Sequence, residues 1–400
     1  MSKCCIQQNI TVPFSYPVYF LHDVFDSDNP LLVDVITSKE KRLHKVIVYI
    51  EKNILNVNAK LLEKITTYCE TYNDSIELVC KPIPLSGGEE LKQLSTIEPI
   101  CKTFNEFHIC RQSFVLIIGG GGLLDAVGFA AAISHRGIRQ IRIPTTLLSQ
   151  DDSGVGVKNG INMFNIKNFA GCFAPPFAVI NDFDFLKTLP RRDSIAGISE
   201  AFKVAMIKDK TFYEWLIQNR ELLASLDQQT IEYTIQRSAE LHLEHIRSNN
   251  DPFEFGSARP LDFGHWAAHK LEMLTNGKRS HGEAVAIGIL IDSLYAFTLG
   301  YVSKEEFITL HTTFKEITLP VWDDVLLQQN EDETLSILSG IDDFQEHLGG
   351  DLHITMPNCI GNKIELSYIS RTTIIKIIHV LAELHKGSGY EIIDRLSSDI

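Results

Sequence analysis

The chain has 400 residues, 44% of them hydrophobic, and a formal net charge of −14 at pH 7. Its length and apolar content predict two domains, each with a core of its own. The negative charge argues against nucleic-acid binding, because an acidic surface repels phosphates. A small anionic substrate is still compatible with this charge, since such a molecule needs only a local cluster of cations.

The N-terminus and the cysteines favour a cytoplasmic protein with no membrane partner. No apolar run reaches the roughly 18 residues that span a bilayer. The opening residues, MSKCCIQQNITVPF, lack the apolar core and the small-residue cleavage site of a secretory signal. The eight cysteines have no metal-finger spacing, so we expect them to be reduced thiols.

Strands and helices alternate through the first half of the chain. Strands are predicted at 46–50, 76–80, 114–118, 141–143 and 178–180, and helices at 59–71, 89–104 and 126–133. This alternation predicts a mostly parallel, doubly wound, Rossmann-like sheet. After Pro190, long helical periodicities follow at 194–207, 230–248, 266–275 and 283–299. We expect an α/β fold, with a cofactor-binding domain at 1–190 and a mostly α-helical metal- and substrate-binding domain at 191–400.

A glycine-rich turn, GGGGLLD at 119–125, follows the strand at 114–118 and precedes a helix. Such a turn lets backbone N–H groups approach a diphosphate at the positive end of the helix dipole. Four glycines alone also suit a merely tight turn between a strand and a helix. Asp125 and the later run Pro144-Thr145-Thr146 shift the balance toward a nicotinamide cofactor.

Three histidines mark a candidate metal site in the second half. His265 and His269 lie four residues apart at the start of a predicted helix, so both can share one face, and His281 opens the next helix. Two histidines and a carboxylate would suit a catalytic zinc. Glu200, on an otherwise apolar helix, is our candidate for the carboxylate. Helical histidines also cap and pack, so the spacing alone leaves both readings open.

An ordered set of motifs over residues 45–360 resembles the sugar phosphate cyclases, the 3-dehydroquinate synthase superfamily. The motifs are GGGGLLD (119–125), RGIRQIRIPTTLLSQDDSGVGVKNGIN (136–162), KN (167–168), LPRRDSIAGISEAFK (189–203), DFGHWAAH (262–269) and HGEAVAIG (281–288). The resemblance implies an enzyme that combines NAD-assisted oxidation, phosphate elimination, re-reduction and intramolecular aldol closure in one site. It also implies a sugar phosphate substrate, and NAD with Zn²⁺ or Co²⁺ as cofactors, since both metals suit the same ligands.

The resemblance implies roles for individual residues. The metal would be bound by Glu200, His265 and His281. Asp152 and Lys203 would hold substrate hydroxyls beside it. The substrate phosphate would be recognised by a polar set in which the arginine reaches in from a neighbouring subunit of a homodimer: Arg136, Lys158, Asn168 and His269. The NAD contacts would come from Glu51, Asn53, Glu89, Lys92, Gly120, Gly121, Asp125, Thr145, Thr146, Lys167 and Thr188.

Several of these residues also have an ordinary structural reading. Lys158 and Lys203 could be surface lysines, and Asp152 follows Asp151 in the kind of acid pair that is common in turns. His269 could be a core histidine. The motif around Asp152 and Lys158 favours the functional reading for both.

Three departures from the dehydroquinate synthase pattern bear on the substrate. Those enzymes bind the carboxylate of a heptulosonate with cations, but this chain has Ala258 for an arginine, Glu244 for a lysine and Asp262 for an asparagine. The exchanges remove two positive charges and add two negative ones, which disfavours a substrate carboxylate by on the order of several kcal/mol. The Asp-Phe-Gly-His run resembles the cyclases of sedoheptulose 7-phosphate, which has no carboxylate, and we expect that substrate.

Two other functions stay open at this point. In a 3-dehydroquinate synthase, Arg259 would have to serve the substrate carboxylate. The segment around His347 also departs from that family, which has a phosphate-binding lysine there; His347 could replace the lysine or be an ordinary loop histidine. A metal-dependent polyol dehydrogenase shares the two-domain plan, but it has no use for the phosphate set of Arg136, Lys158 and Asn168.

Overall fold

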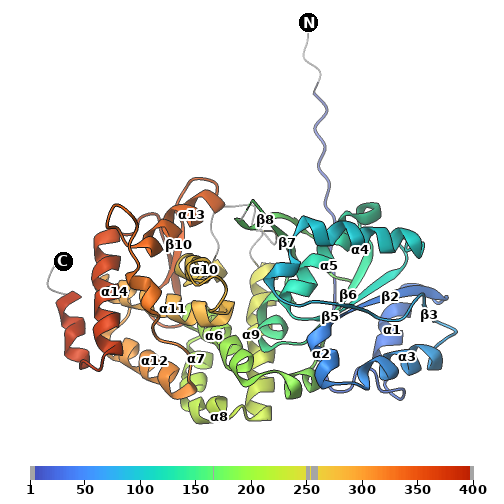
Figure 1. The fold of residues 1–400 in the computed structure, drawn as a ribbon, viewed down its shortest axis with the longest axis horizontal. Coiled ribbons are helices and arrows are strands. Elements are labelled where there is room, and N and C mark those ends of the chain that lie inside the picture. Colours follow the sequence, from blue (N-terminus) through green and yellow to red (C-terminus); the bar gives the residue numbers. More distant parts are fainter. Residues whose placement is uncertain (1–4, 165, 249–252, 254–259, 397–400) are drawn as a thin grey trace, which may run out of the picture.

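The structure, a computed structural model, describes residues 5–164, 166–248, 253 and 260–396. Figure 1 shows a part built around a sheet beside a part built of helices. This arrangement confirms the expected fold class, a Rossmann-like N-terminal part with a mostly helical C-terminal part. Whether the two domains divide at residue 190 stays a prediction. None of the helices in the described ranges is long and apolar enough to cross a membrane.

A seven-stranded sheet forms the first part, in the order β1-β9-β6-β5-β2-β3, with β4 also paired to β2. All these pairings are parallel. Parallel strands end at the same edge of a sheet, so the residues that follow them gather there. The strands are β1 (Val18–Leu21), β2 (His44–Glu51), β3 (Ile76–Leu78), β4 (Ile83–Leu85), β5 (Phe114–Gly119), β6 (Arg139–Pro144) and β9 (Ala178–Asp182).

Helices cover both faces of this sheet. On β2, Val46, Val48 and Ile50 pack into one core, whereas Ile47 and Tyr49 pack into a second core on the opposite face. The first core includes residues of α1 (Leu31–Thr37), α2 (Lys52–Val57) and α3 (Leu61–Thr71), and the second those of α4 (Leu94–Glu106) and α5 (Gly121–Ile133). A strand buried on both faces must be apolar throughout, which explains the unbroken apolar run in the sequence.

One predicted helix begins later than expected. The sequence predicts a helix over 89–104, but Glu89–Leu91 form a short 3₁₀ turn (η1) and α4 begins only at Leu94. Gln93 is extended, with φ −125° and ψ 150°, and bridges to Asn162. The N–H of Asn162 donates to the carbonyl of Lys92 at 2.6 Å. These contacts with a neighbouring hairpin interrupt the helix and fix the position of Lys92.

That hairpin, β7 (Lys158–Met163) and β8 (Ile166–Phe173), is antiparallel and was not among the predicted elements. Figure 1 places it where the sheet part meets the helical part. A second unpredicted hairpin pairs β10 (Ile354–Pro357) with β11 (Lys363–Leu366). Both strands of the first hairpin mix polar, glycine and apolar residues, so they lack the clean two-residue alternation that marks a strand.

The four long helices predicted for the second half are confirmed, each beginning slightly earlier than expected. They are α6 (Arg191–Lys208), α9 (Gln228–Ser248), α10 (His265–Leu274) and α11 (His281–Thr298). The helices α10 and α11 approach closely, because a Cβ atom on Gly288 would lie 2.0 Å from the carbonyl oxygen of Gly264. Further helices complete this part: α7 (Lys210–Gln218), α8 (Arg220–Ser225), α12 (Lys304–Ile317), α13 (Ser339–His347) and α14 (Arg371–His385).

Candidate active site

The glycine-rich turn lies at the carboxyl edge of the sheet, between β5 and α5. The N–H of Gly120 donates to a carboxylate oxygen of Glu51, at the end of β2, at 3.0 Å. The N–H of Thr145, after β6, donates to the carbonyl of Gly119 at 3.1 Å. A Cβ atom on Gly122 would lie 2.6 Å from the carbonyl oxygen of Gly88, so only glycine fits this approach. The ends of three neighbouring strands thus form one polar platform at the N-terminus of a helix.

Beside this platform, Lys92 is buried among polar partners. Its Nζ atom lies 2.8 Å from Oδ2 of Asp125 and 3.7 Å from Oε1 of Glu89, and it donates to the side-chain oxygen of Asn168. Burial lowers the pKa of Lys92, but the carboxylates of Asp125 and Glu89 raise it by more, so the amine stays charged. The contacts join four residues expected at the cofactor and phosphate sites.

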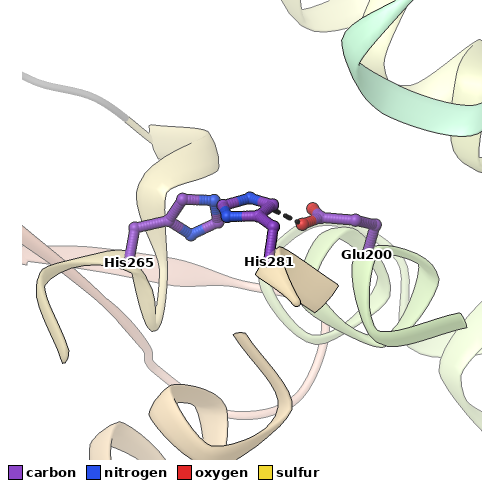
Figure 2. Close-up of side chains that lie close together, drawn as sticks. All are labelled: Glu200, His265 and His281. Atoms are coloured by element: carbon purple, nitrogen blue, oxygen red, sulfur yellow. Dashed lines mark ion pairs between the residues drawn. The ribbon is translucent and has the colours of Figure 1, made fainter. Parts of the chain in front are cut away.

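Three potential metal ligands converge in the helical part. Glu200 on α6, His265 at the start of α10 and His281 at the start of α11 each offer a ligand atom, and these atoms all lie within 4.8 Å of one another. Figure 2 shows the two imidazole rings facing the Glu200 carboxylate, with Nε2 of His281 3.6 Å from Oε1 of Glu200. Glu200 is 1% exposed. A buried carboxylate facing two imidazoles is a donor set typical of zinc.

The ring nitrogens that face away from this cluster already have partners. Nδ1 of His265 donates to the carbonyl of Phe263 at 3.0 Å, and Nδ1 of His281 lies 3.3 Å from Oε2 of Glu272. These contacts leave the Nε2 lone pairs for a metal, the arrangement common around bound zinc. Burial, and then the nearby ammonium of Lys203, hold the pKa of His265 well below its usual value, so the ring is neutral, as a ligand must be. The residues therefore fit a bound divalent metal.

Asp152 and Lys203 lie directly beside the three candidate metal ligands. Nζ of Lys203 contacts the carboxylate of Glu200 and lies 3.3 Å from Oδ1 of Asp152. Burial lowers the pKa of Lys203, but the two carboxylates raise it by more, so the amine is held charged. The same oxygen of Asp152 lies 2.8 Å from Nδ1 of His242 on α9. Oδ1 of Asp152 therefore contacts both Lys203 and His242.

A cavity of about 430 Å³ connects these groups. It lies between the hairpin β7–β8 and the helices α6, α9, α10 and α11, and it is large enough for a small sugar phosphate. The expected site residues that line it are Asp125, Asp152, Lys158, Asn168, Lys203, His265, His269 and His281.

The comparisons with known proteins fit this geometry. The family model of the 3-dehydroquinate synthase N-terminal domain matches residues 82–196, and that of the C-terminal domain matches residues 197–340. The 3-dehydroquinate synthase of Buchnera aphidicola subsp. Baizongia pistaciae (strain Bp) is 32% identical over 320 residues, covering 79% of this chain and 86% of the relative. That of Buchnera aphidicola subsp. Cinara cedri (strain Cc) is 34% identical over 309 residues, covering 77% and 80%.

The chain belongs to the 3-dehydroquinate synthase family. It is therefore an enzyme of the sugar phosphate cyclase superfamily, as its motifs indicate. The solved structure of ValA, the 2-epi-5-epi-valiolone synthase of Streptomyces hygroscopicus subsp. jinggangensis 5008, with NAD⁺ and Zn²⁺ bound, has a TM-score of 0.84 at 25% identity, covering 95% of this chain and all of that one. A 2-deoxy-scyllo-inosose synthase shares the fold at a TM-score of 0.70 and 20% identity, over 91% of this chain and 96% of that one.

Some residues expected from the family pattern lie away from the cavity. Arg136 is exposed in a 3₁₀ turn (η2, Ser134–Arg136) with φ +62°, and it is not among the described residues that line the cavity of its own chain. Asn53 is exposed on α2, and the exposed Thr188 donates its hydroxyl to the carbonyl of Phe185 at 3.2 Å. The NAD roles of Asn53 and Thr188 stay predictions.

The three residues that depart from the dehydroquinate synthase pattern lie differently with respect to the cavity. Asp262 lines the cavity. Glu244 is exposed on α9 and is not among the described residues that line the cavity, so its contribution at the substrate stays a prediction. Ala258 and Arg259 lie outside the described residues, as does the side chain of His347. Within the described residues, the charge argument therefore depends on Asp262.

Several residues that position the loops and helices around the cavity were missed by sequence reasoning. The guanidinium of the buried Arg142 donates to the carbonyls of Gly154 and Gly156 at 3.2 and 2.7 Å, which braces the loop between Asp152 and Lys158. Three more were missed: Glu272, His242 and Asp292. Asp292 is a polar side chain on an otherwise apolar helix face, a signal that could have drawn attention to it but that does not name a partner. Glu272 and His242 have other polar residues on their helix faces, so the sequence carried no such signal for them.

The missed Asp292 supports the turn that carries the candidate metal ligand His265. It is fully buried on α11, and its two carboxylate oxygens accept from the N–H of Gly264 at 2.9 Å and from Nε1 of Trp266 at 2.8 Å. These two donors flank His265. Trp266 is itself buried, and its hydrogen bond to Asp292 ties α10 to α11.

Proposed function

We propose that the protein is an NAD- and zinc- or cobalt-dependent cyclase that converts sedoheptulose 7-phosphate to a cyclitol, with release of phosphate. The observation that carries the proposal is the joint position of three groups in one cavity. The metal ligands, the Asp152–Lys203 pair and the polar set of Lys158, Asn168 and His269 all line it or border it. The structural likeness to a valiolone synthase supports this choice of substrate.

The metal ligands would be Glu200, His265 and His281, and the NAD would lie along the platform formed by Glu51, Gly120 and Thr145. When bound, the divalent metal lowers the pKa of a substrate hydroxyl and polarises a carbonyl, while NAD⁺ accepts a hydride. The ketone formed by that oxidation acidifies the neighbouring C–H bond, and this allows the phosphate to leave.

The residues of the chain orient and neutralise the substrate. The charged amine of Lys203 donates to a substrate hydroxyl, while Oδ2 of Asp152 accepts from a second one. Lys158 and Asn168 on the hairpin β7–β8 and His269 on α10 bind the phosphate. Holding the reacting carbons in one conformation supplies much of the acceleration of an intramolecular aldol closure. NAD bound beside the cavity would supply both the oxidation and the later re-reduction, so no net NADH would form.

A homodimer belongs to the same proposal. Arg136 is exposed and is not among the described residues that line the cavity of its own chain, so a partner subunit would have to present it to the phosphate. Large apolar side chains on the hairpin β7–β8 support an association surface, because Phe164 is 75% and Phe169 54% exposed. Mixing an inactive Lys203→Ala variant with an Arg136→Ala variant would then restore activity in hybrid dimers.

A 3-dehydroquinate synthase is the second candidate. The relatives at 32% and 34% identity carry that name. It would act on a carboxylated heptulosonate phosphate, against which the carboxylate of Asp262 in the cavity is repulsive. The structural likeness to glycerol dehydrogenases, at 16% identity, concerns the fold alone.

The experiment that tests the proposal is the stoichiometry of turnover. Purified protein with zinc, a trace of NAD⁺ and sedoheptulose 7-phosphate should release one phosphate per sugar consumed, with no net NADH. A polyol dehydrogenase would accumulate NADH and release no phosphate, which would contradict the proposal.

A further inference from the structure

The carboxylate of Glu272 contacts both a candidate metal ligand and a residue expected to bind NAD. Oε2 of Glu272 on α10 lies 3.3 Å from Nδ1 of the metal ligand His281, and Oε1 of the same side chain lies 2.7 Å from Nζ of Lys167. Glu272 is only 6% exposed. Each oxygen of this buried carboxylate therefore has a charged or polar partner, and the two partners belong to different halves of the chain.

Lys167 lies on β8 and has a second partner toward the cofactor platform. Its Nζ atom is 3.8 Å from Oε1 of Glu89, which lies in turn 3.7 Å from Nζ of Lys92. The amide of Asn162, on the paired strand β7, donates to the other oxygen of Glu89 at 2.9 Å. A continuous series of polar contacts thus runs from the metal ligand His281 through Glu272 and Lys167 to the cofactor side.

We infer that Glu272 couples metal binding to NAD binding, acting as a positioning residue for His281 and Lys167 together. The inference deepens the proposed function and rests on it. A carboxylate that accepts from the outer nitrogen of a ligating histidine fixes the ring and its tautomer. The same carboxylate is the nearer of the two partners of Lys167, and it holds the amine toward the cofactor side.

The coupling has a definite sign. A bound cofactor that orders Lys167 also orders Glu272, so part of the entropy cost of orienting His281 is already met when the metal arrives. NAD should then tighten zinc binding, and zinc should tighten NAD binding by the same factor, because linkage between two binding sites is reciprocal. We expect about a tenfold effect, within the range usual for such coupling.

The test measures zinc affinity by chelator competition on apo-protein, with and without saturating NAD⁺, and uses no turnover. Wild type should bind zinc about tenfold more tightly with NAD⁺. Glu272→Gln should bind zinc about 10- to 100-fold more weakly, the usual loss for a residue behind a ligand, and should lose the response to NAD⁺. Lys167→Met leaves the carboxylate beside His281, so it should keep the zinc affinity of NAD-free wild type but lose the response.

The matched control is Lys270→Met on the same helix. It removes an ion pair between Nζ of Lys270 and Oδ2 of Asp343, 3.0 Å apart, that touches neither site, and both the zinc affinity and its NAD response should stay as in wild type. A wild-type response in Glu272→Gln would overturn the inference. If that variant does not fold, an unchanged response in Lys167→Met would overturn it.

The outcomes separate this inference from the proposed function. Wild-type protein that binds zinc and NAD⁺ independently, yet releases phosphate from the sugar, would refute the coupling and leave the cyclase intact. Protein that binds neither zinc nor NAD⁺ would refute both.

Discussion

His242 and Asp152 form a close pair in the lining of the cavity, with Nδ1 of the histidine 2.8 Å from Oδ1 of the carboxylate. Lys203 contacts the same oxygen at 3.3 Å. With two neighbours on Oδ1, the second oxygen of Asp152 is the one presented to a substrate. His242 on α9 therefore determines how Asp152, in the π-helical turn η3 (Ser149–Ser153), faces the cavity.

Replacing His242 should reduce turnover while leaving the metal in place. A hydrogen bond to a charged group contributes about 1.5–3 kcal/mol, so His242→Leu should lower kcat by about 10- to 100-fold. His242→Gln, which keeps a donor, should recover much of this loss. Steady-state kinetics and a zinc assay check both statements. Equal losses in the two variants would show that the hydrogen bond is not what matters.

Removing either of two ligands should abolish metal binding. Glu200→Ala and His281→Ala each leave two protein ligands, and we expect zinc affinity to fall by more than about 100-fold, beyond the range for residues behind a ligand. Activity should disappear with the metal. Full zinc occupancy in both purified variants, measured by elemental analysis, would refute the ligand set.

Neutralising Asp262 should shift substrate preference toward the carboxylated sugar. Two unit charges 4 Å apart interact by about 4 kcal/mol at an effective dielectric of about 20, so Asp262→Asn should raise the relative kcat/KM for the heptulosonate phosphate by more than about tenfold. The control is Glu244→Gln, which alters an exposed carboxylate outside the cavity and should change nothing. An unchanged preference in Asp262→Asn would remove the electrostatic explanation.

The buried His311 should make the fold sensitive to acid. Burial, and then the nearby Lys315, lower the pKa of His311 to about 4, and its Nδ1 atom lies 2.9 Å from the hydroxyl of Tyr390. Below pH 6.5 the unfolded chain binds a proton that the folded chain refuses, so stability falls as the pH drops toward 4. The loss approaches about 3 kcal/mol.

His311→Gln removes this titration and keeps a polar side chain beside Tyr390. Between pH 7 and pH 4.5 the variant should therefore lose less unfolding free energy than wild type, by about 2 kcal/mol. Denaturant unfolding at both pH values measures the difference, and other titrating groups cancel in it. Parallel losses in the two proteins would show that His311 is not the group responsible.

The parts of the molecule that were predictable have local signals. The strand at 114–118, the glycine turn and the helix after it follow from apolar runs and turn residues, and the candidate ligands His265 and His281 follow from motifs at helix starts. Glu272 and His242 could not be predicted with their partners, because Lys167 and Asp152 lie 105 and 90 positions away in the chain. Helix α4 begins late for the same reason, since contacts with the hairpin β7–β8 override local helix preference at Gln93.

The central claim is that the cavity takes a seven-carbon sugar phosphate without a carboxylate. The most direct measurement is phosphate release by the purified protein with NAD⁺ and zinc, comparing sedoheptulose 7-phosphate with the carboxylated heptulosonate phosphate. Release from sedoheptulose 7-phosphate alone, or with at least about a hundredfold preference as repulsion from Asp262 implies, is the predicted result. Release from the heptulosonate phosphate alone would contradict the account and establish a 3-dehydroquinate synthase.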